Sequence, residues 1–207
     1  MSQKFSDIVD SLVVRGWALK HGFLPVVAIE SLLEEARERW LAGRFLRAGV
    51  GRGSERQIRA DARGDHILWL DESSLTTAQS RYWSEIESLR VGLNRELFLG
   101  LVSFEAHYAY YPEGAFYRKH IDRFSDSDER TLSISLYLNP DWKEEEGGQL
   151  RLYTGGQEIE IYPLAGTLVI FKSDTVPHEV APAKRERFSL TGWFKRRGKQ
   201  GHFPFSI

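Results

Sequence analysis

The stretch YRKHIDRF, residues 117–124, holds two side chains whose types and spacing could do chemistry. His120 and Asp122 stand two residues apart, and on an extended strand such residues point to the same side. The imidazole and the carboxylate could therefore converge on one point. A His-x-Asp pair also arises by chance, and the alternative is a solvated histidine beside an aspartate in a turn.

The stretch VPHEVAPAKRERF, residues 176–188, supplies a second histidine and an arginine. Two histidines and one carboxylate around an open face are the usual protein ligands of non-haem Fe(II), so His178 would complete such a set. Arg187, on the following strand, can form a bidentate pair with a carboxylate. The combination favours a ligand that chelates iron at one end and presents a carboxylate at the other, as 2-oxoglutarate does.

Two strand-like stretches would position these residues, TLSISLYL (131–138) and RFSLTGWF (187–194). Each alternates between a strongly apolar face and a face of small polar side chains that ends in a larger one. The polar sets are Thr131, Ser133, Ser135 and Tyr137, and Arg187, Ser189, Thr191 and Trp193. In many antiparallel sheets such a face meets water. In a jelly roll it points inward, and we favour this pocket for a polar, anionic ligand.

The first hundred residues predict the elements that pack on these strands. Residues 25–41 carry apolar side chains at helical spacing and begin with Pro25, which suits a first helical turn. A second apolar stripe, from residue 75 to 97, predicts a helix capped by Ser73 or Ser74. Between them, segment 44–65 is rich in glycine and arginine, which is typical of a surface loop or of a mobile lid.

From about residue 101, short apolar and polar alternations are broken by turn signals, which is typical of a barrel or a double-sheet jelly roll. We therefore expect one mainly β (α+β) domain over residues 1–207. Its parts would be an N-terminal helical support over about 1–100, packed on the major sheet, a jelly-roll core over about 101–195, and a basic tail at 196–207.

Composition excludes several classes of protein. The formal net charge of -1 gives no basic field to recruit nucleic acid or an anionic membrane surface. Cysteine is absent, so disulfides and thiolate metal sites are excluded. No apolar run is long enough to cross a bilayer, and the opening MSQKFSDIVD has no signal-peptide pattern. We expect a cytoplasmic protein without nucleic-acid or membrane partners.

Several stretches taken together resemble the Fe(II)/2-oxoglutarate-dependent oxygenases. They are YYPEGAFYRKHID, RTLSISLYLNPDW, EEGGQLRLY, PHEVAPAKRERFSLTGWF and, upstream, RGDHILWL. Within that family they are most similar to the prolyl hydroxylase domain group, which includes the animal hypoxia-inducible-factor prolyl hydroxylases and bacterial relatives. The resemblance covers about two thirds of the chain and implies a double-stranded β-helix, the jelly roll of these enzymes.

The resemblance also implies roles for residues of the core. The ligands of Fe(II) would be His120, Asp122 and His178. The distal carboxylate of 2-oxoglutarate would be bound by Arg187, with help from Tyr137 and Thr191. The tyrosines that line the pocket near the metal and the co-substrate would be Tyr111 and Tyr117.

Further positions match those that meet the substrate in the family. The rim of the pocket would be formed by Arg130 and Trp193. The segment 44–65 matches a loop that folds over the substrate, although its sequence agrees only at residues 63–65. Within it Arg63 and Asp65 would bind substrate, and Asp65 could pair with Arg130 on closure. The other histidines, His21, His66, His107 and His202, are interpreted as structural or solvated.

The activity that the resemblance implies is hydroxylation of a prolyl residue in a protein, coupled to conversion of 2-oxoglutarate and O2 to succinate and CO2. Ascorbate is a further candidate cofactor, and a translation factor is the target suggested by analogy with bacterial relatives. The main alternative is an oxygenase of a free amino acid or another small molecule. A cupin-like isomerase and a non-catalytic binding domain are the remaining alternatives.

Overall fold

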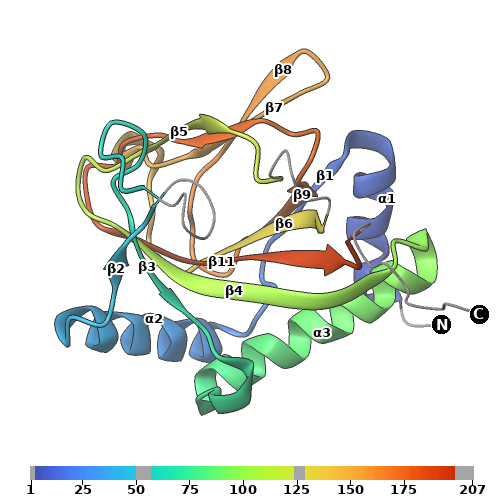
Figure 1. Ribbon diagram of the computed structural model, residues 1–207, viewed down its shortest axis with the longest axis horizontal. Helices are drawn as coiled ribbons and strands as arrows, with labels where there is room; N and C mark the ends of the chain where they lie inside the picture. The colour runs from blue at the N-terminus through green and yellow to red at the C-terminus, as the bar shows by residue number, and fades with distance from the viewer. Residues whose placement is uncertain (1–2, 50–56, 124–128, 199–207) are drawn as a thin grey trace, which may run out of the picture.

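The computed structural model describes residues 3–49, 57–123 and 129–198 (Figure 1). The helices are α1 (Ser6–Arg15), α2 (Val26–Leu41) and α3 (Thr77–Leu97), with short 3₁₀ turns at Gln3–Phe5, Glu72–Ser74 and Glu144–Glu146. The strands are β1 (Trp17–Lys20), β2 (Leu46–Arg47), β3 (His66–Trp69), β4 (Leu101–Tyr111), β5 (Tyr117–His120), β6 (Arg130–Tyr137), β7 (Leu150–Thr154), β8 (Gln157–Ile161), β9 (Leu168–Lys172), β10 (His178–Val180) and β11 (Arg187–Arg196).

Two antiparallel sheets make up the core. The major sheet has the order β1-β9-β6-β11-β4-β3-β2, and the minor sheet has the order β5-β10-β7-β8. In Figure 1, α2 and α3 run along the outer side of the major sheet, and the strands of the minor sheet lie on its other side. The prediction of a mainly β fold, with a jelly-roll core and N-terminal helices on the major sheet, is confirmed.

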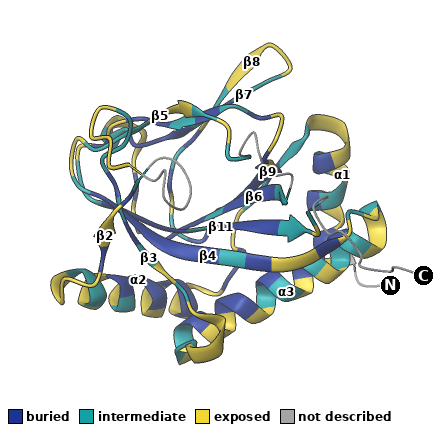
Figure 2. Ribbon diagram, viewed as in Figure 1, coloured by how far each residue is buried: buried dark blue, intermediate teal, exposed yellow. Residues whose placement is uncertain are grey.

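The alternation along β6 and β11 explains why helices cover one face of the major sheet. The apolar faces lie in one hydrophobic cluster with side chains of the three helices, among them Ile8, Leu32 and Ile86. The members contributed by β6 and β11 are Leu132, Ile134, Leu136, Phe188, Leu190 and Phe194. Each such buried side chain stabilises the fold by roughly 1.5–3 kcal/mol. Figure 2 shows the buried strands between the half-exposed helices and the minor sheet.

The two predicted helices are present, but the start of the second one differs from the prediction. α2 follows Pro25, which occupies the N-cap position. α3 begins after Thr76, whose hydroxyl accepts from the Gln79 backbone N–H while the Gln79 side chain accepts from the Thr76 N–H. The expected caps Ser73 and Ser74 are wrong, because they belong to a separate 3₁₀ turn that an extended residue divides from α3. The capping box satisfies two helix-terminal donors at once, which favours the later start.

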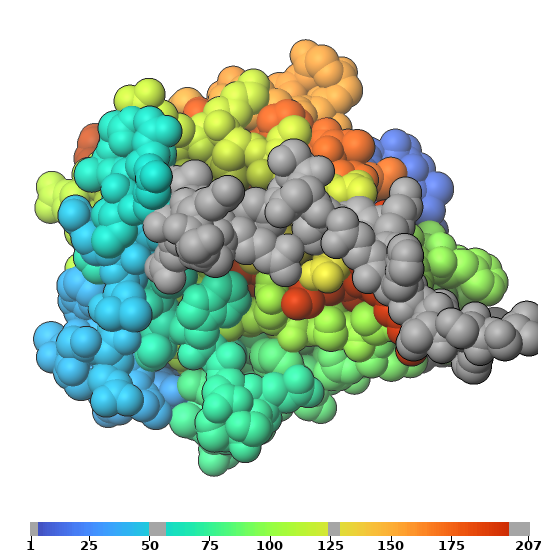
Figure 3. All heavy atoms as spheres, viewed as in Figure 1, coloured from blue at the N-terminus to red at the C-terminus, as the bar shows by residue number. Residues whose placement is uncertain are grey.

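The N-terminal part of the chain is not only a helical support. It adds β1 to one edge of the major sheet and β2 and β3 to the other. Residues 50–56 of the predicted loop and 199–207 of the predicted tail lie outside the described residues. The described part of the loop is anchored to β5. Arg63 forms an isolated antiparallel β-bridge with Tyr117, and the N–H of Arg118 donates to the carbonyl oxygen of Ala62. Figure 3 shows residues 57–65 packed at the surface beside β5.

None of the helices in the described ranges is long and apolar enough to cross a membrane.

Candidate active site

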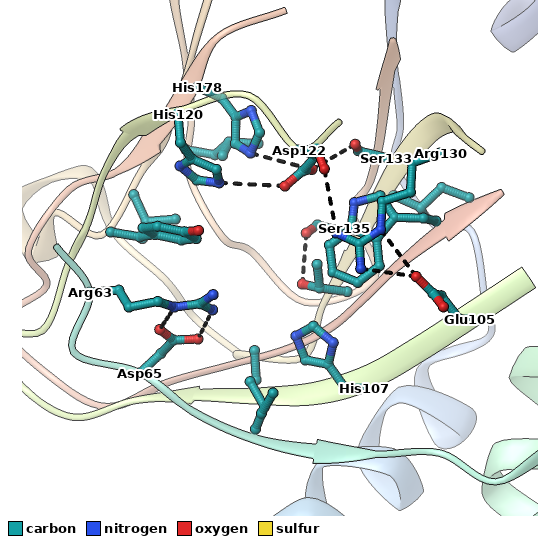
Figure 4. Close-up of a pocket in the computed structure, with 18 of the residues that line it drawn as sticks. Arg63, Asp65, Glu105, His107, His120, Asp122, Arg130, Ser133, Ser135 and His178 are labelled. Carbon is teal, nitrogen blue, oxygen red and sulfur yellow. Dashed lines mark hydrogen bonds and ion pairs between the residues drawn. The ribbon is translucent and has the colours of Figure 1, made fainter. Parts of the chain in front are cut away.

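Two histidines and one aspartate meet between the strands of the minor sheet and face the major sheet. His178 on β10 lies directly opposite His120 on β5. The Nε2 atoms of His120 and His178 each lie 3.5 Å from one oxygen of Asp122. The candidate ligand atoms of the three residues all lie within 4.8 Å of one another. Figure 4 shows both rings directed at the carboxylate, so the structure brings together the three residues expected to bind Fe(II).

Hydrogen bonds fix which ring nitrogens face the centre. Nδ1 of His120 lies 2.7 Å from the carbonyl oxygen of Arg118, and Nδ1 of His178 lies 3.2 Å from that of Val176. In each histidine Nδ1–H donates to the backbone, which leaves the Nε2 lone pair for a metal ion. Burial lowers the pKa of His178 to about 4, so its ring is neutral at pH 7. A neutral imidazole is the form that binds a metal.

Asp122 is ionised and held in place from the opposite side. Burial opposes its charge, but His178, His120 and the Ser133 hydroxyl outweigh that effect and hold the pKa of the carboxyl below its usual range. Ser133 donates to Oδ2 of Asp122 at 2.7 Å, and its own oxygen lies 2.9 Å from that of Ser173. The site therefore presents two imidazoles and one carboxylate on an open face, which is a fitting donor set for Fe(II).

The deep end of the same cavity holds a buried cation. Arg187 is only 2% exposed, and its guanidinium carbon lies 5.0 Å from the ring centroids of both Tyr111 and Tyr137. In the described ranges, Nε of Arg187 has no hydrogen-bond partner, and no carboxylate pairs with the guanidinium. A buried charge without a counter-ion is expensive, so these atoms fit a bound anion.

Of the other residues expected to bind the co-substrate, some line the cavity and one does not. Tyr111 and Thr191 line the cavity, whereas Tyr137 is fully buried behind Arg187 and does not line it. The hydroxyl of Thr191 lies 3.0 Å from that of Ser135. The cavity has a volume of about 540 Å³, which is room for a small dicarboxylate beside the ligand set and for part of a second molecule.

Ion pairs stand at the mouth of the cavity (Figure 4). Asp65 pairs with Arg63 at 2.6 Å, and Glu105 pairs with Arg130 at 2.9 Å. The guanidinium carbon of Arg130 lies 3.6 Å from the ring centroid of Trp193. Asp65 and Arg130, expected to pair with each other on closure, thus have different partners in this structure.

The first of these pairs reaches the candidate ligand set through Tyr117. The guanidinium carbon of Arg63 lies 4.0 Å from the ring centroid of Tyr117. Tyr117 in turn stacks on His120, with centroids 3.6 Å apart. The four residues form a continuous wall from the buried Asp65 carboxylate to the ligand set.

Residues 106–195 match the family model described as the 2OG-Fe(II) oxygenase superfamily. The solved structure of a Pseudomonas putida prolyl-4-hydroxylase is 45% identical to this chain, covers 94% of it and all of that chain, and superposes with a TM-score of 0.84. The chain belongs to the 2OG-Fe(II) oxygenase superfamily.

Two further relatives of this oxygenase come from animals. A prolyl hydroxylase from Trichoplax adhaerens, solved with a peptide fragment of the hypoxia-inducible-factor oxygen degradation domain, is 28% identical, with a TM-score of 0.83 over 92% of this chain and 88% of that one. The hypoxia-inducible factor prolyl hydroxylase of Caenorhabditis elegans is 30% identical over 93% of this chain. The present chain spans only 28% of the length of that relative.

Two residues of the oxygenase site were missed by sequence reasoning. Ser133 was assigned to the inward face of β6, but its bond to Asp122 was not foreseen. His107 was interpreted as structural or solvated, yet it lines the cavity and is only 4% exposed. The signal was present, because His107 lies four residues before Tyr111 on one strand and must share its face.

Proposed function

We propose that this oxygenase hydroxylates a prolyl residue of a protein substrate and converts 2-oxoglutarate and O2 to succinate and CO2. The observation that carries the proposal is the His120, Asp122 and His178 cluster, facing the buried Arg187, in a chain that is 45% identical to a solved prolyl-4-hydroxylase over that protein's whole length. The third position of the ligand set is filled by the Asp122 carboxylate, which favours hydroxylation.

The ligand set would hold Fe(II) through Nε2 of both histidines and through Asp122. Bound iron, with 2-oxoglutarate and O2, supplies the oxidising chemistry that no side chain of this protein can provide. Ser133 orients the Asp122 carboxylate, and backbone carbonyls orient both imidazoles. The protein's own contribution is thus to fix and orient the ligands.

Arg187 would bind the distal carboxylate of 2-oxoglutarate as a charge-assisted pair. Tyr137 would help by holding the Arg187 guanidinium in place, and Thr191 and Tyr111 would line the path toward the iron. Tyr117 would support His120 by stacking. Because Arg187 is buried before the anion arrives, it needs little reorganisation on binding.

The mouth of the cavity supports a polypeptide substrate. Trp69 and Ile121 stand at the mouth with 47% and 46% of their surfaces exposed, next to the Arg63 and Arg130 ion pairs. Exposed apolar side chains beside charged groups suit a chain that lies across the surface. The Trichoplax relative was solved with such a peptide bound.

Three finer parts of the proposal concern the setting of the reaction. A translation factor is the proposed target, the cytoplasm is the proposed location, and ascorbate is a proposed accessory to the iron. Detection of the tagged protein in fractionated cells tests the location. The dependence of steady-state turnover on added ascorbate tests the role of ascorbate.

A coupled assay tests the proposed activity. Purified protein with Fe(II), 2-oxoglutarate and O2 should release succinate faster with proline-containing peptides than with free proline or other amino acids. Asp122→Ala, which removes one ligand, should abolish both the basal and the stimulated release. Stimulation by a free amino acid and not by any prolyl peptide would favour the small-molecule alternative instead.

A further inference from the structure

Two buried polar atoms at the mouth of the cavity have no hydrogen-bond partner among the residues that the structure describes. They are Nδ1 of His107 and Nε1 of Trp193, in side chains that are 4% and 7% exposed and that both line the cavity. Their rings adjoin, with centroids 5.5 Å apart. A buried polar atom that stays unpaired destabilises a fold by about 1–3 kcal/mol, so a pair of them at one place indicates a missing ligand.

These atoms lie at the opposite end of the cavity from Arg187 and Tyr111. On β4 and β11, Tyr111 faces Arg187 in register, and His107 faces Thr191 four residues further along. At about 3.3 Å per residue, the row formed by Arg187 and Tyr111 and the row formed by Thr191 and His107 are roughly 13 Å apart. A five-carbon dicarboxylate spans only about 5 Å between its carboxyl carbons. A dicarboxylate bound at Arg187 therefore leaves the His107 row for a second molecule.

Aromatic neighbours hold the two rings in position. The His107 ring lies between Trp69, with centroids 4.9 Å apart, and Trp193. Arg130 covers the Trp193 ring and is itself held by Glu105. Figure 4 shows the His107 ring rising from β4 into the pocket. The unpaired atoms are therefore fixed in advance of binding, which is the arrangement that recognition by hydrogen bonds needs.

We propose that His107 and Trp193 form a subsite that donates hydrogen bonds to a backbone carbonyl oxygen next to the target proline. The inference rests on the proposed function and names the group of the substrate that the mouth recognises. Trp193 Nε1 can only donate, and a carbonyl oxygen has two lone pairs for two donors. Proline itself has no backbone N–H, so the chain around it offers carbonyls to a site made of donors.

The protonation of His107 agrees with this role. Burial, with the positive charges of Arg63 and Arg130, lowers the pKa of its ring to about 3. The ring is therefore neutral at pH 7 and carries one N–H, which can be placed on Nδ1. A neutral donor suits an uncharged amide oxygen, whereas an anion would call for the protonated ring.

Binding of a capped alanine peptide with one central proline tests the subsite. The protein is loaded with Zn(II) in place of Fe(II), which prevents turnover, and with 2-oxoglutarate. His107→Phe and Trp193→Phe each remove one donor and keep a ring, so each should weaken peptide binding about 5- to 100-fold. The dissociation constant of 2-oxoglutarate should change less than about twofold. His66→Phe is the matched control, because its buried Nδ1 is also unpaired but does not line the cavity.

A spectroscopic readout separates a contact from a structural effect. In protein with ¹⁵N-labelled histidine, the peptide should shift the His107 Nδ1 resonance, which the His107→Phe variant assigns. Unchanged peptide affinity in both variants, or an equal loss of 2-oxoglutarate affinity, would overturn the subsite. If the wild-type protein binds 2-oxoglutarate but no prolyl peptide, the proposed function itself fails and the subsite falls with it.

Discussion

Arg187→Met gives the most informative perturbation of the co-substrate end, because it should stabilise the empty protein while it weakens co-substrate binding. The guanidinium is buried and no carboxylate in the described ranges pairs with it. Desolvation of such a charge costs several kcal/mol, and two cation–π contacts offset about 0.5–2 kcal/mol each. Methionine fills most of the volume without the charge, so the free energy of unfolding should rise by about 1–3 kcal/mol.

The effect on binding has the opposite sign. Loss of one partner of a buried, hydrogen-bonded charge pair weakens binding by about 2–5 kcal/mol, which is about 30-fold or more. At a 2-oxoglutarate concentration about 100 times the wild-type dissociation constant, the ligand stabilises the wild type by about 2.7 kcal/mol. For a variant that binds about 30-fold more weakly, the same concentration gives less than about 1 kcal/mol.

Thermal melts with Mn(II) in place of Fe(II), with and without 2-oxoglutarate, measure both effects. About 1 kcal/mol corresponds to roughly 2–4 °C for a chain of this size. Arg185→Met is the matched control, since the Arg185 side chain is 37% exposed and pairs with Glu146 outside the cavity. It should leave the ligand-induced shift unchanged and give no gain in stability. An Arg187→Met protein that melts below the wild type without ligand, or that keeps the full ligand-induced shift, would refute the reasoning.

Three further changes have defined outcomes. Ser133→Ala should weaken metal affinity about 10- to 100-fold by calorimetry, because Asp122 loses its orienting donor, whereas Ser135→Ala should not. Asp65→Ala should lower the free energy of unfolding by about 3–5 kcal/mol in urea titrations, because Arg63 is left half-buried without its carboxylate partner. The same change should weaken peptide binding more than 2-oxoglutarate binding. Equal losses of the two affinities would contradict the assignment of Asp65 to the substrate end. The pKa of His107 is depressed, so the unfolded chain takes up a proton below pH 6.5 that the folded chain refuses until about pH 3. The free energy of unfolding should therefore fall by about 1.4 kcal/mol for each unit that the pH is lowered from 6.5 toward 3. The His107→Phe variant should lack this part of the pH dependence.

The architecture was predictable because the alternation along β6 and β11 leaves only one face of each strand that can pack against the helices. Each of these strands carries its large apolar side chains on a single side, as Ile134 and Leu190 illustrate, so only one face can pack against the helices. The start of α3 was not predictable in the same way. Ser73, Ser74 and Thr76 are all good N-cap residues close together in the sequence, and only the backbone conformation selects among them.

The site divides along similar lines. His120, Asp122 and His178 were identified from residue types and spacing, and the structure places their ligand atoms together. The partner of Asp65 could not be foreseen, because a residue two positions away and a residue across the cavity offer the same charge. His107 was missed because a histidine without a spaced partner carries no signal until the register of β4 against β11 is known.

The central claim is tested most directly by the fate of isotopically labelled O2. Purified protein with Fe(II), 2-oxoglutarate and labelled O2 is added to lysate from cells that lack the gene, with Asp122→Ala as the inactive control, and the peptides are analysed by mass spectrometry. We predict label on a prolyl residue of a protein, present with the wild type and absent with the variant. Succinate release with label only in small metabolites would contradict it.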